Sequence, residues 1–240
     1  MKPERRIIKL LNGDLAPWRL HPRDIPLPEQ TNVKINTIRA CQSTSTETAW
    51  HDLLDQKSSL SLPSNSQHTL DLQADCHSTA FVTLKFKAAS PTRVKIKMIY
   101  SEGYELEPRD YPFFRTKNDR LDAEHGYILG TFDEVTINVG PDGTSYEPFW
   151  FRTFRLIRLE LTIGDAEVEM ISMEASQTNY PMQVKASWDD PSDEHAGKIL
   201  DISVRTLRNC MFDGYSDCPY YEQLSSVSLF IFFQLNAAHL

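Results

Sequence analysis

Hydrophobic and polar residues alternate along the middle of the chain, from about residue 68 to residue 177. In residues 92–102, TRVKIKMIYSE, hydrophobic side chains stand at every second position with basic side chains between them. This spacing sends alternate side chains to opposite faces of a sheet, so it indicates half-buried strands. With turn signals such as PDG at 141–143, the pattern predicts a mainly β fold, an antiparallel, jelly-roll-like β-sandwich over residues 66–180. The same alternation recurs in residues 79–87, 133–139 and 155–163, and more weakly in residues 166–175.

The spacing changes near residue 187, where hydrophobic residues begin to recur at intervals of three and four. This pattern predicts one amphipathic helix with a narrow buried stripe, ending near Phe212. Asp190 is expected to cap its start, with Pro191 in the first position. Gly214 is suited to end it, because glycine adopts left-handed backbone conformations without steric cost. We expect a second helix to start at Pro219.

The first part of the chain, residues 1–65, has little periodicity and is rich in proline. Proline fixes the backbone without donating a hydrogen bond, so a stretch such as PWRLHPRDIPLP at 17–28 is typical of an extended segment on a surface. A polar stretch, QKSSLSLPSNSQ, follows at 56–67. We therefore expect residues 1–65 to form an extended N-terminal connector.

Composition and charge exclude several classes of protein. The chain has 240 residues and a net charge of −8, with 40% hydrophobic residues, which is typical of a globular protein. An acidic chain has no electrostatic attraction for nucleic acid or anionic lipid, so neither partner is expected. The apolar run at 227–233, VSLFIFF, is far shorter than the roughly 20 residues that cross a bilayer. Lys9 interrupts the first apolar run, so we recognise no signal peptide and expect a cytoplasmic protein unless the natural start lies upstream.

Cysteine and histidine spacing gives no sign of a metal or a cofactor. The four cysteines, Cys41, Cys76, Cys210 and Cys218, form no CxxC pair, and the histidines have no metal-ligand spacing. We expect reduced thiols, no metal site and no cofactor.

The stretch CMFDGYSDCPYYEQL, residues 210–224, combines acidic and aromatic side chains at the end of the predicted helix. If the second helix starts at Pro219, Asp217 precedes it and Glu222 lies in its first turn, so both carboxyl groups meet at its start. Two carboxylates held close together cannot both ionise easily, and the one that keeps its proton can serve as a general acid. The alternative from these residues alone is a helix cap and a solvated acid. Tyr220 and Tyr221 are candidates to stack on a sugar ring or, alternatively, to pack in the protein.

Two stretches resemble a known family. Residues 206–224, TLRNCMFDGYSDCPYYEQL, and residues 146–161, YEPFWFRTFRLIRLEL, resemble the inverting alpha-L-rhamnosidases of fungi and actinobacteria. The resemblance implies that the β-sandwich leads into an (α/α)₆ six-hairpin catalytic barrel, here starting at residue 187 and incomplete at residue 240. It also implies that Glu222 protonates the leaving glycosidic oxygen, while Asp217 binds the sugar and tunes that acid. The match stops after Leu224.

The resemblance predicts a glycoside hydrolase that removes terminal alpha-L-rhamnosyl groups, with rhamnosides as its partners. Because most of the barrel and the catalytic base would come later in such a protein, we expect this chain to have little or no hydrolytic activity by itself. The alternatives are a non-catalytic carbohydrate-binding β-sandwich and a structural fragment that binds nothing. An apolar tail without a barrel to cover it predicts self-association.

Overall fold

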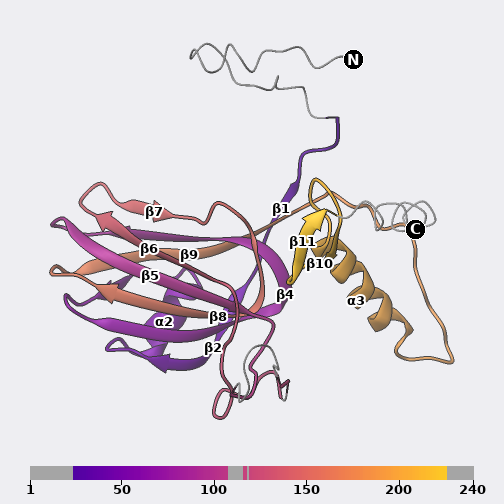
Figure 1. Cartoon of the computed structure of the whole chain (residues 1–240), viewed down its shortest axis with the longest axis horizontal. Coiled ribbons are helices and arrows are strands. Elements are labelled where there is room, and N and C mark those ends of the chain that lie inside the picture. Colours follow the sequence, from indigo (N-terminus) through magenta and orange to yellow (C-terminus); the bar gives the residue numbers. More distant parts are fainter. Residues whose placement is uncertain (1–23, 108–115, 118, 226–240) are drawn as a thin grey trace.

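The computed structural model describes residues 24–107, 116, 117 and 119–225. Among these residues, the chain forms a nine-stranded antiparallel sheet that curls around a hydrophobic core (Figure 1). The strands of this sheet are β1 (Glu29–Asn32), β2 (Ile35–Gln42), β3 (Leu60–Leu62), β4 (Gln67–Lys87), β5 (Thr92–Ser101), β6 (Phe132–Val139), β7 (Thr144–Tyr146), β8 (Arg152–Ile163) and β9 (Val168–Asn179). The other elements are the helices α2 (Glu47–Leu54) and α3 (Ala196–Asn209) and a hairpin of β10 (Ser216–Cys218) and β11 (Glu222–Ser225).

Strand β4 connects the two halves of the curled sheet. Its first part lies between β2 and β8, with Leu70 opposite Leu159. The register shifts over residues 73–78, and the second part lies between β9 and β7, with Leu84 opposite Met173. Strands β5 and β6 extend the first half beyond β8, and β1 and β3 extend the second half beyond β9. The sheet is therefore continuous, because one 21-residue strand belongs to both halves.

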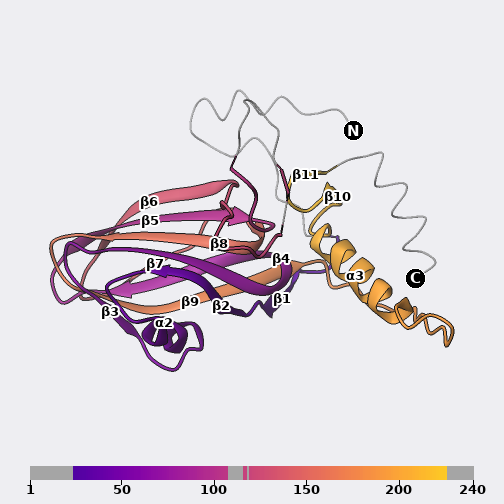
Figure 2. The same ribbon diagram turned by 90° about the horizontal axis from the view of Figure 1, so that it is seen from below.

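The alternating hydrophobic positions of β4, β5, β8 and β9 fill the core inside this curl. Helix α2 packs beside the sheet (Figure 2) and adds Trp50 and Leu53 to the core. Burial of one such side chain contributes about 1.5–3 kcal/mol to the free energy of folding. The fully buried strand residues include Leu70, Leu72, Val82, Leu84, Phe86, Ile96, Met98, Phe154, Leu159 and Leu161. The predicted mainly β, antiparallel architecture is thus confirmed.

The predicted connector over residues 1–65 is wrong from Glu29 onward, where the chain forms β1, β2, α2 and β3. Thr46 caps α2 by accepting a hydrogen bond from the backbone N–H of Ala49, and Leu60 and Leu62 of the polar-looking stretch are buried against β9. Short elements with few hydrophobic residues give weak periodicity, and their burial depends on the sheet around them. Residues 1–23 of the predicted connector lie outside the described residues.

Helix α3 starts at Ala196, five residues later than the sequence predicted, and ends at Asn209. Asp190 caps a tight turn instead of the helix, because its carboxylate accepts hydrogen bonds from the backbone and side chain of Ser192. The helix extends away from the sheet (Figures 1 and 2), and its buried residues, Ala196 and Asn209, stand at its two ends. Among the described residues, no helix is long and apolar enough to span a membrane.

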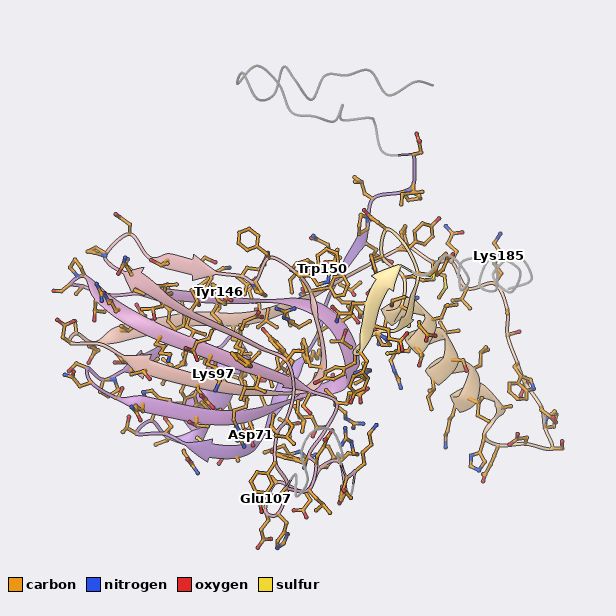
Figure 3. The ribbon with its side chains drawn as sticks, viewed as in Figure 1. Asp71, Lys97, Glu107, Tyr146, Trp150 and Lys185 are labelled. Carbon is orange, nitrogen blue, oxygen red and sulfur yellow. The ribbon has the colours of Figure 1, made fainter. Side chains whose placement is uncertain are left out.

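A buried ion pair stabilises the sheet away from α3. Asp71 of β4, labelled in Figure 3, accepts two hydrogen bonds from the guanidinium of Arg158 on β8, with N–O distances of 2.7 and 2.8 Å. The hydroxyl of Tyr104 donates to the same carboxylate at 2.9 Å. Burial, followed by the negative charge of Asp71, raises the pKa of Tyr104.

Candidate functional site

The candidate site is the segment that follows α3, where the chain turns back as the β10–β11 hairpin (Figure 1). Cys218 pairs with Glu222 across the hairpin, with Pro219 at the start of the turn. The predicted second helix at Pro219 is therefore wrong. Side chains of the hairpin form hydrogen bonds with backbone groups of the turn. The Cys218 sulfur accepts a hydrogen bond from the backbone N–H of Tyr221, and the Gln223 amide donates one to the carbonyl of Pro219.

Contacts with the end of the sheet fix the hairpin in place. The Tyr220 hydroxyl donates to the backbone carbonyl of Tyr100 at 2.8 Å, and the Thr153 hydroxyl donates to the carbonyl of Pro219 at 2.6 Å. Gly130 permits this approach, since a Cβ atom there would lie 1.7 Å from the Tyr100 carbonyl oxygen and 2.5 Å from the Tyr220 hydroxyl. These tertiary contacts favour the hairpin over a helix.

A buried polar cluster joins the end of α3 to the sheet. The Asn209 side chain donates to the carbonyl of His77 at 2.8 Å and accepts from the Gln177 amide at 2.7 Å. The Asn179 amide donates to two carbonyls at the end of α3, and the Thr79 hydroxyl lies 3.3 Å from the carbonyl of Asn209. This cluster was not predicted from the sequence. The feature that could have indicated it is the presence of amide side chains at the end of β9 and at the end of α3.

Aromatic rings pack together where the end of α3 meets the sheet. Phe212, which follows α3, lies with its ring centroid 5.2 Å from that of Phe151 and 6.0 Å from that of Trp150. Figure 3 places Trp150 at the end of the sheet beside the hairpin. Trp150, which is 46% exposed, therefore packs against Phe151 and against the segment that follows α3.

The hairpin brings the side chains of Asp217 and Glu222 together, although both residues are exposed. A hydrogen bond between the two carboxyl groups raises the pKa of Glu222, and the negative charge of Asp217 adds to this effect. A raised pKa means that Glu222 keeps its proton to a higher pH than an isolated glutamate does. The arrangement is chemically suited to proton donation at a position open to a ligand.

The two tyrosines of the hairpin have different environments. Tyr220 is 9% exposed, and its hydroxyl donates a hydrogen bond to the backbone carbonyl of Tyr100. Its ring therefore anchors the hairpin and is not accessible to a ligand. Tyr221 is 56% exposed, and its ring centroid lies 4.7 Å from that of Tyr220 at an interplanar angle of 80°. Tyr221 is therefore the ring that is open to a ligand beside Glu222.

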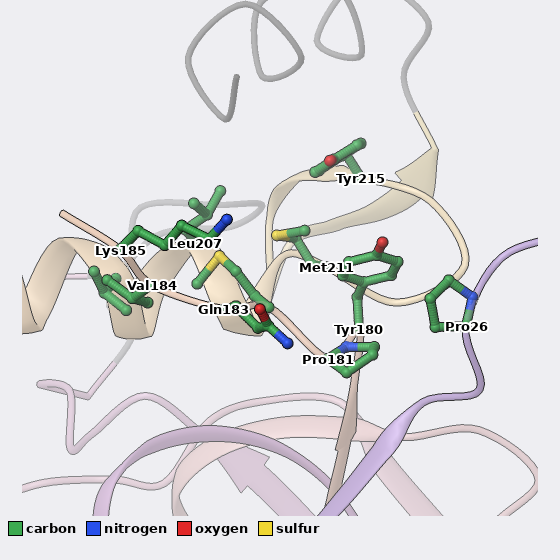
Figure 4. A pocket seen from close by; sticks show the side chains of 11 residues that line it. Pro26, Tyr180, Pro181, Gln183, Val184, Lys185, Leu207, Met211 and Tyr215 are labelled. Atoms are coloured by element: carbon green, nitrogen blue, oxygen red, sulfur yellow. The ribbon is translucent and has the colours of Figure 1, made fainter. Parts of the chain in front are cut away.

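A cavity of about 580 Å³ lies next to the hairpin, between the chain that leaves β9 and helix α3. Figure 4 shows Tyr180 and Met211 near one end of it and Leu207 and Lys185 near the other. Tyr215, from the loop before β10, also lines it. Of the residues that the structure describes, neither carboxyl of the candidate pair lines this cavity, so the pair and the cavity are separate features.

Within residues 24–107, 116, 117 and 119–225, no group of three or more histidine, cysteine, aspartate or glutamate side chains is arranged to hold a metal ion. The four cysteines are free thiols. Burial raises the pKa of the Cys210 thiol, which does not favour the reactive thiolate.

No protein-family model and no curated protein sequence matches the chain. Among solved structures, a GH78 family rhamnosidase of Bacillus sp. GL1 superposes with a TM-score of 0.48 and 23% identity, over 69% of this chain and 15% of that chain. A rhamnosidase from Klebsiella oxytoca with rhamnose bound gives a TM-score of 0.48 and 13% identity, over 82% of this chain and 38% of that chain. A structure described as "CBM4 structure and function" superposes with a TM-score of 0.28 and 13% identity, over 47% of this chain and 61% of that chain. The chain spans less than half of either rhamnosidase, and likenesses at this level do not establish a family.

Proposed function

We propose that this chain is part of a glycoside hydrolase of the alpha-L-rhamnosidase type, which hydrolyses terminal alpha-L-rhamnosyl linkages with inversion. In this proposal Glu222 is the general acid, and Asp217 binds the sugar and raises the pKa of Glu222. Helix α3 would be the first helix of an (α/α)₆ barrel. The contact between the carboxyl groups of Asp217 and Glu222 carries the proposal, because it raises the pKa of Glu222 and glycoside hydrolysis requires a carboxyl group that can donate its proton. The motif at residues 206–224, which resembles that of the inverting rhamnosidases, supports it.

The proposed step is the transfer of the Glu222 proton to the glycosidic oxygen as the bond to the anomeric carbon breaks. Inversion also needs a base that activates water on the opposite face of the sugar, with the two carboxyl groups about 6.5–9.5 Å apart. Asp217 is hydrogen-bonded to Glu222 and is therefore too close to leave room for that water. Another residue therefore has to supply the base. We propose that the 240-residue chain alone has little or no hydrolytic activity.

Titration of the purified chain with L-rhamnose, followed by NMR, tests this function. We expect saturable shifts of the hairpin resonances and loss of binding in Asp217→Asn. Glu167→Gln is the matched control, because Glu167 is an exposed acid in the turn between β8 and β9. Absence of rhamnose binding, or equal binding of D-glucose, would contradict the proposal. Release of chromophore from an aryl rhamnoside at the rate of a complete rhamnosidase would contradict the proposed lack of activity.

A non-catalytic carbohydrate-binding module is the second candidate. It is favoured by the exposure of Tyr221, Asp217 and Glu222, because an open surface with an aromatic ring is suited to binding a sugar that is not cleaved. The variant Glu222→Gln separates the two candidates when a complete enzyme carrying this hairpin is assayed. Loss of hydrolysis with binding retained favours the acid, whereas unchanged hydrolysis favours the binding module.

A further inference from the structure

Two of the cysteines lie where the end of α3 meets the hairpin. Cys210 is the residue at which α3 ends, and Cys218 is the last residue of β10. Figures 1 and 2 both show β10 beside the end of α3. The carbonyl of Cys210 accepts a hydrogen bond of 3.0 Å from the backbone N–H of Ser216, and Met211 pairs with Tyr215. The chain therefore turns back directly after α3 and brings Cys218 toward the end of the helix.

The sulfur of Cys210 lies beside the backbone next to Cys218. Its Sγ atom is 3.8 Å from the carbonyl oxygen of Asp217, the residue that precedes Cys218. From the dimensions of a peptide unit, Cys210 Sγ is then at most about 7 Å from the Cα atom of Cys218. Burial raises the pKa of the Cys210 thiol most, and the negative charge of an ionised Cys218 raises it further. The two thiols are therefore neighbours.

The two thiols differ in their access to a reagent. Cys210 is 2% exposed, whereas Cys218 is half-buried, with its sulfur 3.2 Å from the backbone nitrogen of Tyr221. Thiol–disulfide exchange starts at a thiol that the reagent can reach, and a second thiol beside it can complete the exchange. Cys218 has the position of the first thiol and Cys210 that of the second. The other cysteines, Cys41 and Cys76, lie on β2 and β4, away from the hairpin in sequence.

We propose that Cys210 and Cys218 form a reversible disulfide, which makes the junction of α3 and the hairpin a redox-sensitive modification site. Both are free thiols in the structure, which is the reduced state. A small disulfide such as oxidised glutathione is the oxidant. The Cys218 thiolate attacks one glutathione sulfur and releases one glutathione thiolate. The Cys210 thiolate then attacks the Cys218 sulfur, forms the protein disulfide and releases the second, and the two glutathione thiolates take up the protons that the two cysteines lose.

The disulfide fixes the hairpin, with Asp217 and Glu222, to the end of α3. Cys210 provides a firm attachment, because its backbone N–H is hydrogen-bonded to carbonyls in the last turn of the helix and its carbonyl to Ser216. A bond between residues 210 and 218 also closes a short loop, which restricts the unfolded chain and so stabilises the fold. The disulfide requires no hydrolytic activity, so its test is separate from that of the proposed function.

Treatment of the purified 240-residue chain with oxidised glutathione, followed by peptide mass spectrometry, tests the proposal. Proteolysis before aspartate residues separates the two cysteines, because Asp213 and Asp217 lie between them. We expect the two peptides to be joined, at about 2 Da below the sum of their masses, and to separate after reduction. Glutathione that stays attached to Cys218, or the absence of any link between the two peptides, would overturn the proposal.

Variants test the order of the two steps. The double variant Cys41→Ser, Cys76→Ser keeps the pair and should form the same link at the native rate. In Cys218→Ser, the buried Cys210 should react with glutathione at least about tenfold more slowly than Cys218 does in the native chain. An equally fast reaction of Cys210 in that variant, with circular dichroism confirming that it folds, would contradict the assigned order.

Urea unfolding tests whether the disulfide fits the native fold. The oxidised native chain should unfold at a higher urea concentration than the reduced chain, because the closed loop restricts its unfolded state. Cys218→Ser is the control, and the same glutathione treatment should leave its midpoint unchanged. A lower midpoint for the oxidised native chain would show that the bond forms only when the hairpin leaves its native position, and the proposal would fail.

Discussion

The side-chain hydroxyl of Tyr220 donates a hydrogen bond to the backbone carbonyl of Tyr100, 2.8 Å away, across 120 positions of sequence. Tyr100 stands near the end of β5, and Tyr220 lies in the turn between Cys218 and Glu222. This contact determines where the hairpin lies on the sheet, and therefore where the carboxyl pair is presented. The candidate site is thus positioned by the sheet and not by α3 alone.

The first prediction concerns this hydrogen bond. Tyr220→Phe leaves the carbonyl of Tyr100 without its partner, so the free energy of unfolding should fall by about 1 kcal/mol. Hydrogen exchange should show faster opening of the hairpin than of the sheet. Tyr221→Phe is the matched control, because Tyr221 is exposed and its hydroxyl makes no hydrogen bond to the described residues of the sheet. Equal effects of the two variants would contradict the anchoring role of Tyr220.

The second prediction concerns Gly130. A methyl group at this position overlaps the Tyr100 carbonyl oxygen, so Gly130→Ala should lower the free energy of unfolding by about 2 kcal/mol and displace the hairpin. Gly140→Ala is the control, since nothing lies within 4 Å of a Cβ atom there. Urea unfolding measures both variants. A Gly130→Ala protein as stable as Gly140→Ala would show that the observed close approach is not required.

The strands of the sheet were predictable because each has enough alternating positions to show a period of two. The residues Val94, Ile96, Met98 and Tyr100 have this pattern and are all buried. Elements before residue 66 were not predictable in this way. Their burial depends on β4 and β9, which contact them from distant parts of the sequence.

The third prediction concerns His68, which is buried between two serines. Ser66 donates its hydroxyl proton to the carbonyl of Pro63, so it accepts a hydrogen bond from Nε2–H of His68. Nδ1 then accepts from Ser43, 2.7 Å away, whose oxygen also accepts from the indole N–H of Trp50. The network fits a neutral imidazole, and burial lowers the pKa of His68 below its ordinary value of 6.5.

In the unfolded chain His68 binds a proton as the pH falls through about 6.5, whereas in the folded chain its lowered pKa keeps it neutral to a lower pH. His68 therefore makes the fold less stable as the pH falls through that value. The free energy of unfolding should fall by about 1 kcal/mol between pH 7 and pH 5.5. His68→Gln should reduce this pH dependence, whereas His195→Gln, on the exposed start of α3, should keep it. An unchanged pH dependence in His68→Gln would contradict a neutral buried His68.

The fourth prediction concerns the Asp71–Arg158 ion pair. Asp71→Asn leaves the guanidinium of Arg158 without a counter-charge in a largely buried position, so the free energy of unfolding should fall by about 3 kcal/mol. Asp75→Asn, at an exposed position of the same strand, should change it by less than about 0.5 kcal/mol. Chemical denaturation of both variants measures the difference. Equal stability would show that the buried pair does not stabilise the sheet.

The backbone of the candidate site was not predictable from the sequence, and the roles of its residues stay predictions. The acidic and aromatic residues around Pro219 indicated a site, but the helix expected there is a hairpin. Tyr220 and Thr153 hydrogen-bond the turn to the sheet, and Gly130 leaves space for this close approach. No local sequence pattern reveals such long-range contacts. The apolar run at 227–233 lies outside the described residues, so self-association through it stays a prediction.

The pKa of the Glu222 carboxyl group, measured by NMR titration of the native chain and of Asp217→Asn, tests the central claim most directly. The account predicts a pKa above the ordinary value of 4.5 in the native chain, and a shift back toward that value when the charge of Asp217 is removed. A Glu222 that titrates at its ordinary value in both proteins would contradict the claim that Asp217 raises the pKa of this carboxyl group.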